Sequence, residues 1–275
     1  MMKKGFKYLS LLFVVALVLT GCGKKDSKKE SKENNNSTED FKNVVLKTFD
    51  AKGLDVKADM NIGMKISGME VSIKMNMNGQ AYYGDNPSAH YTIKSSTMGV
   101  ESTQEQYMVI KDGQQYTYQK VDNKGWEYTK SAIGQVNLKD NLKKVFDQAK
   151  EIKEVNSDKD GYTKYEITVD GNKLSDTISK LDNNKSNAAK VSDVKFTAYT
   201  KDGYVSIIEM DLTDVVKNIM SSTGAENQLA SADMTGKVSI ELSNHGKVNE
   251  ITVPQDVTSS AKESNNLDSI LNIMK

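Results

Sequence analysis

The sequence predicts an α+β fold that is mainly antiparallel β: a curved half-barrel sheet of about ten strands, with helices covering its concave face. Three observations predict this class. Many stretches alternate apolar and polar residues with period two, which indicates one-sided strands. Short turns separate these stretches, which favours hairpins. Segments with helical spacing interrupt the strands, and we expect them to cover the apolar face of a sheet whose twist makes it curl.

The first 21 residues predict a lipoprotein signal peptide. Three lysines within the first seven residues precede an apolar run over 9–19, which is too short for a comfortable membrane span. The run ends in Leu-Thr-Gly-Cys at 19–22. This resembles the bacterial lipobox, in which the cysteine is lipidated and becomes the first mature residue. Cys22 is the only cysteine in the sequence, so the alternative is a free thiol or an intermolecular disulfide. We expect a diacyl anchor on Cys22, at the extracytoplasmic face of a bacterial cell membrane.

Two further units follow the signal peptide. Residues 22–40 are dense in Lys, Glu, Ser and Asn and cannot build a core, so they predict a polar flexible tether. Residues 41–275 are enough for one sizeable domain. The chain has 37 basic residues, all lysine, and 37 acidic ones. Without the lysines of the signal peptide the balance is slightly acidic, so no nucleic-acid partner is expected.

The domain begins with an amphipathic helix and a long hairpin. Helical spacing predicts the helix over 39–52, with Ser37 or Thr38 as its N-cap. The period then changes to two, and a two-residue loop at 67–68 brings every apolar residue of the hairpin onto one face. A slip of one residue would move them all to the other face, so the register is well specified. The predicted pairs are Ile66 with Met69, Met64 with Val71, Ile62 with Ile73, and Met60 with Met75.

The rest of the chain alternates between strands and helices. Strands are predicted over 89–97, 102–110, 114–120, 126–130 and 162–170. Helical spacing is found over 138–149, 172–182, 214–220 and 267–274. Two more hairpins are predicted. A three-residue loop at 201–203 would place Phe196 opposite Ile208, and a turn at 245–246 would place Ile240 opposite Ile251.

This organisation resembles that of the LppX/LprG-type lipoproteins and their Gram-positive relatives, and more distantly the LolA/LolB and RseB carriers and sensors. The order is lipobox, polar tether, helix and long hairpins, then YMVIKDGQQYTYQKVDNKGWEYTK over 107–130 and a closing ITVPQDV over 251–257. The resemblance spans most of the mature chain. It implies an antiparallel half-barrel whose concave face, roofed by helices, holds lipid or acyl chains. It implies no catalytic residue.

Methionine is concentrated on the apolar face of the first hairpin, where residues 59–79 hold five of the 13 methionines. One interpretation is a packed core, in which thioethers fill irregular gaps; another is a pocket that adapts to flexible acyl chains. A copper(I) site is a third, but the stretch has no His or Cys to support it. The candidate ligand lining consists of Met60, Ile62, Met64, Met69, Val71, Ile73, Met75 and Met77.

Aromatic residues are frequent on the strands that follow. Strand propensity alone predicts sheet packing for them. Their amphipathic rings also suit the rim of a lipid groove. The candidates for such a rim are Tyr91, Tyr107, Tyr116, Tyr118 and Trp126.

Nothing in the sequence recommends catalysis. The chain has two histidines, His90 and His245, and its only cysteine is assigned to lipid, so a metal site or a nucleophilic triad is not expected. No nucleophile elbow, zinc-protease motif or phosphate loop is found. We therefore expect no enzyme and no cofactor.

The sequence thus favours a membrane-anchored lipoprotein that binds a lipid or another hydrophobic ligand for carriage or sensing. The alternative is a non-catalytic envelope scaffold or regulatory partner with a filled core, which would bind another envelope protein through its surface or a strand edge. An open apolar groove would favour the carrier, and a closed core would favour the partner.

Overall fold

The computed structural model describes residues 35–66, 69–132, 149–171, 193–214, 217 and 233–264. The helices whose bounds it defines are α2 (Asn35–Asp50) and α7 (Gln255–Ser260). The strands are β1 (Gly53–Ile66), β2 (Met69–Tyr82), β3 (Ser88–Thr97), β4 (Val100–Lys111), β5 (Gln114–Val121), β6 (Glu127–Ala132), β7 (Ala149–Val155), β8 (Thr163–Val169), β9 (Val194–Lys201), β10 (Tyr204–Asp211), β11 (Asp233–Ser243) and β12 (Lys262–Glu263).

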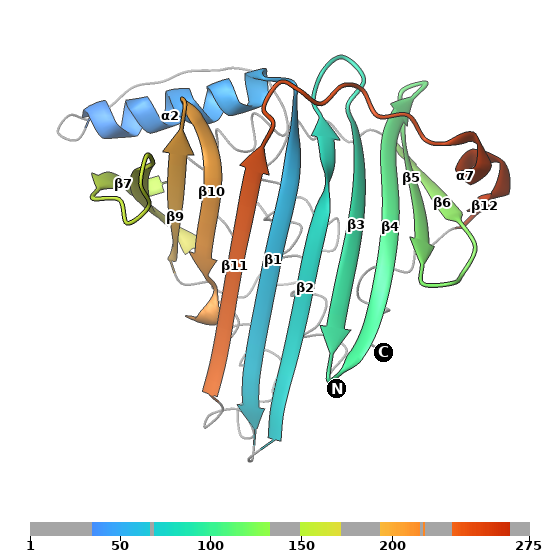
Figure 1. Cartoon of the computed structure of the whole chain (residues 1–275), viewed down its shortest axis with the longest axis horizontal. Helices are drawn as coiled ribbons and strands as arrows, with labels where there is room; N and C mark the ends of the chain where they lie inside the picture. Colours follow the sequence, from blue (N-terminus) through green and yellow to red (C-terminus); the bar gives the residue numbers. More distant parts are fainter. Residues whose placement is uncertain are drawn as a thin grey trace.

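These strands form one open sheet in the order β12-β6-β5-β4-β3-β2-β1-β11-β10-β9-β8-β7 (Figure 1). Every neighbouring pair is antiparallel except β12 and β6. The mainly antiparallel class is therefore confirmed, with twelve strands in the described part of the chain where about ten were expected. Among the described strands, no curling into a half-barrel is detected. The helix α2 lies across one end of the sheet (Figure 1) and packs against β10 and β7.

The register of the first hairpin is confirmed at every predicted pair. Ile66 pairs with Met69, Met64 with Val71, Ile62 with Ile73, and Met60 with Met75. Both strands are 14 residues long. Because the apolar residues of each strand share one parity, this register puts them on a single face.

Two other hairpins differ from prediction. The loop between β9 and β10 has two residues, and Phe196 pairs with Met210, because an irregularity between Val205 and Ile207 shifts the register. The segment 247–253 is not a strand at all. Instead, β11 pairs with β1 on one side and β10 on the other, so Ile240 lies opposite Ala58 and Ile208.

The other predicted elements have different outcomes. The first helix already contains Ser37 and Thr38, so neither is its N-cap. The strand β7 was not predicted, because its sequence AKEIKEV carries four charged residues. The helices expected over 138–149, 172–182, 214–220 and 267–274 lie wholly or mostly outside the described residues.

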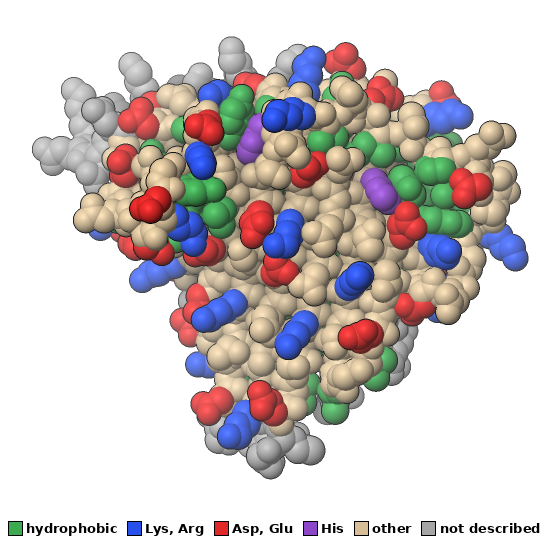
Figure 2. Space-filling model, viewed as in Figure 1, with side chains coloured by type: hydrophobic (Ala, Val, Ile, Leu, Met, Phe, Trp, Pro, Cys, Tyr) green, Lys and Arg blue, Asp and Glu red, His purple; other side chains and the backbone are tan. Residues whose placement is uncertain are grey.

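The core lies on one face of the sheet. Phe41, Val45 and Phe49 line one side of α2 and join the buried apolar side chains of the strands. The ring of Phe41 lies 4.8 Å from that of Tyr165 in β8. The opposite face carries lysines and acidic side chains (Figure 2). We call these the apolar face and the open face of the sheet.

Candidate functional site

The methionine-rich ribbon of β1 and β2 is buried in the apolar face. Met60, Met75 and Met77 are 1–3 % exposed, and Met64 is 7 % exposed. Neighbouring strands extend the ribbon: Met64 pairs with Met234 of β11, and Met210 of β10 is also buried. The structure therefore brings most of the predicted lining together. Of the rest, Ile62 and Ile73 are buried, Val71 is half-buried, and the side chain of Met69 lies outside the described residues.

The predicted aromatic rim is divided between the two faces. Tyr91 lies on the apolar face, where burial raises the pKa of its phenol far above the usual range. Gln80 of β2 is exposed on the open face, and His90 of β3 lies directly opposite it. Tyr107 of β4 pairs with His90 and with Tyr118 of β5. Residues that pair directly point to the same face, so these rings belong to the open face. Tyr116 and Trp126 lie on the open face as well, because the ring of Tyr116 stacks with that of Tyr118 and the ring centroid of Trp126 lies 5.8 Å from that of Tyr107. The four do not flank the methionine ribbon.

At β4 and β5, the apolar face of the sheet carries buried polar side chains. Gln104 and Gln119 are 2 % and 5 % exposed, and Thr117 is also buried. Gln104 Nε2 donates a hydrogen bond to Gln106 Oε1 at 3.4 Å, while the buried Oε1 of Gln104 has no partner among the described residues. An unpaired buried acceptor of this kind costs on the order of 1–3 kcal/mol. The methionine ribbon is thus bordered by an amide stripe.

Two hollows lie on the open face. The first, which we call the lower hollow, has a volume of about 860 Å³ and extends over β7 to β11 and β1 to β2. Its five acidic side chains are Asp59, Glu151, Glu166, Glu209 and Asp211, and its four lysines are Lys74, Lys153, Lys195 and Lys237. The second, which we call the upper hollow, has a volume of about 900 Å³ and crosses β1, β2, β3, β10 and β11. The sequence did not reveal either hollow, because each joins strands distant in the chain.

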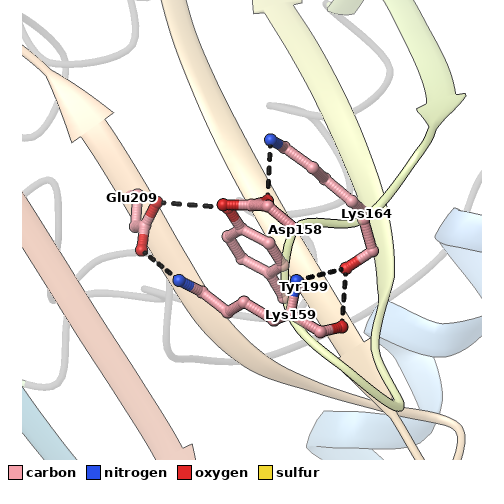
Figure 3. A network of polar contacts seen from close by, with 6 residues as sticks. Asp158, Lys159, Lys164, Tyr199 and Glu209 are labelled. Carbon is pink, nitrogen blue, oxygen red and sulfur yellow. Dashed lines mark hydrogen bonds and ion pairs between the residues drawn. The ribbon is translucent and has the colours of Figure 1, made fainter.

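A polar network closes one side of the open face (Figure 3). Tyr199 of β9 donates a hydrogen bond from its hydroxyl to Asp158 at 3.0 Å, and Lys164 Nζ reaches the same carboxylate at 3.0 Å. Lys159 pairs with Glu209 at 3.2 Å and lies 4.6 Å from the Tyr199 ring centroid. The hydrogen bond from Lys164 is the main cause that lowers the pKa of Asp158 to about 2. The network fastens the loop between β7 and β8 over β9.

An aromatic cluster lies near the opposite edge. Tyr116, Tyr118 and Tyr128 have ring centroids 5.5–6.4 Å apart. Lys130 Nζ lies 5.4 Å from the Tyr128 ring and pairs with Glu263 of β12 at 3.2 Å. Tyr128 also donates to Glu263 at 3.1 Å. These contacts hold the short parallel strand β12 against β6.

Among the described residues, no group of three or more His, Cys, Asp or Glu side chains could hold a metal ion. No helix within that part of the chain is long and apolar enough to cross a membrane. Cys22 lies outside it.

The chain matches the model of a family of unknown function, DUF6612, over residues 36–262. Among solved structures, the chain is similar to the crystal structure of LprF from Mycobacterium bovis, with 14 % identity and a TM-score of 0.39, covering 82 % of this chain and 99 % of that one. No curated protein matches the sequence. Because the family model covers most of the chain, this protein belongs to the DUF6612 family.

Proposed function

We propose that the protein is a lipid-anchored, non-catalytic binding protein of the bacterial envelope that holds an apolar ligand against its methionine-rich face. The anchor is Cys22, by the lipobox-like ending of its signal peptide. The ligand is a lipid or another molecule with acyl chains, bound for carriage or sensing. No cofactor takes part.

The observation that carries the proposal is the continuous run of thioethers along the central strands. Met60 lies opposite Met75, and Met64 lies between Val71 and Met234. Unbranched thioethers change rotamer readily, so this surface can reshape around a flexible chain. A 14-residue strand is about 46 Å long. Burial of acyl surface would contribute about 25 cal/mol per Å² before ordering costs.

The proposal is tested by the lipid content of the protein. A chain starting at Gly23 retains every described element, and we expect organic extraction and mass spectrometry to recover stoichiometric lipid from it. The Met64→Gln variant should bind a dansylated undecanoic acid about tenfold more weakly, because an amide replaces a thioether at the ribbon. Asn61→Gln is the matched control, since Asn61 lies on the same strand and faces the lower hollow. Absence of both co-purified lipid and dansyl-acid binding would contradict the proposal.

A second candidate is an envelope scaffold with a filled interior. The observation that favours it is the low exposure of the ribbon, because Met75 and Met77 are as buried as ordinary core residues. In that case Met64→Gln would lower the free energy of unfolding, and neither the wild-type protein nor the variant would bind the dansyl acid. Thermal unfolding with and without the dansyl acid separates the two candidates.

A further inference from the structure

The upper hollow of the open face has a polar floor between aromatic walls. Figure 2 shows the two histidines of the chain, in purple, on opposite sides of a predominantly polar surface. One wall is His90 of β3, and the other is Tyr162, Tyr204 and His245. The floor is formed by polar side chains of β1, β2, β10 and β11, namely Asp55, Lys57, Asn78, Gln80, Ser206, Glu241 and Ser243.

The floor groups are held in place while keeping bonding capacity. Gln80 Nε2 donates to Asp55 Oδ1 at 2.9 Å, and Asn244 Nδ2 donates to Asp55 Oδ2 at 2.6 Å. Each of these amides therefore keeps a carbonyl oxygen as an acceptor. Lys57 reaches Glu241 at 3.5 Å. Asn78 is exposed opposite Lys57, and its side-chain amide offers two donors and an acceptor.

The wall rings are fixed before any ligand arrives. Tyr204 stacks on His245 with centroids 4.6 Å apart and planes 11° apart, and Lys47 Nζ lies 4.3 Å from the Tyr204 centroid. His245 donates from Nε2 to the carbonyl of Val205 at 3.0 Å. Across the hollow, His90 stacks on Tyr107 at 4.1 Å. Rings that are already immobilised lose little entropy on binding.

The lining carries no net charge from its acids and lysines. Its three acidic side chains are Asp55, Asp202 and Glu241, and its three lysines are Lys57, Lys201 and Lys247. Burial lowers the pKa of His245, which favours its neutral form. A lining with many donors and acceptors but no net charge matches a neutral ligand whose groups both donate and accept.

We propose that the upper hollow binds a neutral oligosaccharide. Sugar hydroxyls can donate to the floor carboxylates and amide oxygens and accept from Asn78 and Lys57, while apolar C–H groups of the sugar rings pack against the aromatic walls. The volume of about 900 Å³ falls within the usual range for ligand sites.

A neutral peptide fits the hollow less well. Peptide recognition needs pockets for side chains or an unpaired strand edge. Val56 and Leu242 of these floor strands point away from the hollow, since they are 3 % and 4 % exposed on the other face. Ile207 of β10, opposite Glu241, faces the hollow but is a single half-buried side chain and forms no pocket. The strand β1 is paired on both sides, with β2 and β11. The floor therefore offers neither feature.

The test is titration of the full-length protein in a sugar-free detergent, observed through side-chain amide NMR signals. The probes are three neutral tetrasaccharides, including chitotetraose, with tetragalacturonate and a neutral Ala/Ser octapeptide for comparison. We expect saturable shifts at Asn78 and Gln80 with at least one neutral tetrasaccharide, and at least tenfold weaker binding of tetragalacturonate and of the peptide.

Matched variants locate the site. Asn78→Ala should weaken tetrasaccharide binding at least fivefold, whereas Asn76→Ala should leave it unchanged, because Asn76 is two residues away on the same strand and bonds Asp59 in the lower hollow. Tyr204→Phe, which keeps the ring, should retain binding, and Tyr204→Ala should lose it. No saturable shift with any tetrasaccharide, equal loss in the two asparagine variants, or tighter binding of the peptide would overturn the proposal. Acyl binding by the opposite face is unaffected by any of these results.

Discussion

At the scale of single residues, Thr48 joins the first helix to the sheet. Its side chain is fully buried and takes part in two hydrogen bonds. The hydroxyl donates to the carbonyl of Val44 at 2.8 Å within α2 and accepts from the backbone N–H of Val205 in β10 at 2.9 Å. Both bonds depend on one oxygen, which explains why a polar residue is tolerated among Phe41, Val45 and Phe49.

Replacement of Thr48 by valine should therefore destabilise the protein. Valine fills the same volume but leaves the Val205 N–H buried without a partner, which costs about 1–3 kcal/mol. Urea unfolding measures this loss. Thr258→Val is the control, because the Thr258 hydroxyl bonds Gln255 on the exposed side of α7. Equal stability of Thr48→Val and wild type would contradict this role.

Asp158 supplies a pH-dependent contribution to stability. Lys164 and Tyr199 donate to its carboxylate, and its pKa in the folded protein is about 2, below the value of about 3.9 for an unfolded chain. A lowered pKa means that the network stabilises the fold above about pH 4, and that this stabilisation is lost as the pH falls toward about 2.

Urea unfolding across this pH range checks the sign. The stability difference between wild type and Asp158→Asn should shrink as the pH falls from about 4 to about 2. Asp160→Asn, an exposed change in the same loop, should show no such dependence. A difference for Asp158→Asn that is independent of pH would rule out the carboxylate as the cause.

At the scale of elements, several hairpins share one turn. Met98-Gly99, Asp112-Gly113 and Asp202-Gly203 each have two residues with positive φ between paired strand ends. This is the two-residue turn whose twist matches that of the strands, and it favours Asn or Asp before Gly. The exposed Met98, at 72 %, shows that position in the turn, rather than polarity, is what this hairpin requires.

Gly203→Ala tests the turn. Gly203 has φ +78°, where a Cβ costs roughly 1–2 kcal/mol, and the added methyl would also meet the end of the Lys47 side chain. The variant should lower the free energy of unfolding by about that amount, as measured in urea. Gly125→Ala should be nearly neutral, because Gly125 has no positive φ and open space around it. Similar effects of the two changes would contradict the account of the turn.

The elements also show what the sequence could and could not predict. The β1–β2 hairpin was predicted to the residue, because its strands are one-sided and adjacent in the chain. The β9–β10 register differed from prediction because the loop has two residues instead of three and because an irregularity beside Val205 adds a further shift. Neither feature leaves a trace in the apolar pattern. The partner of β11 was wrong, because β1 lies about 180 residues earlier in the chain. The open-face hollows were missed for the same reason. The alternation in the sequence tells which face of a strand a residue occupies, but it does not tell which strands lie next to each other.

At the scale of the whole molecule, the sheet separates two chemically different surfaces. The apolar face carries the methionine ribbon and the amide stripe around Gln104, and the open face carries charged side chains, two hollows and the aromatic rings. The ribbon could be predicted from sequence, because alternation assigns each residue to a face. The predicted rim residues are divided between the two faces, because Tyr91 and Tyr107 were grouped by residue type rather than by parity.

The central claim, that an apolar ligand binds along the methionine ribbon, is tested most directly by methionine-methyl NMR. The protein would carry ¹³C-methyl methionine and be titrated with a perdeuterated fatty acid and its protonated counterpart. We predict shifts and intermolecular contacts at Met60, Met64 and Met75, and none at the exposed turn residue Met98, which serves as an internal reference. Unchanged ribbon signals at saturating fatty acid, or changes confined to Met98, would contradict the account.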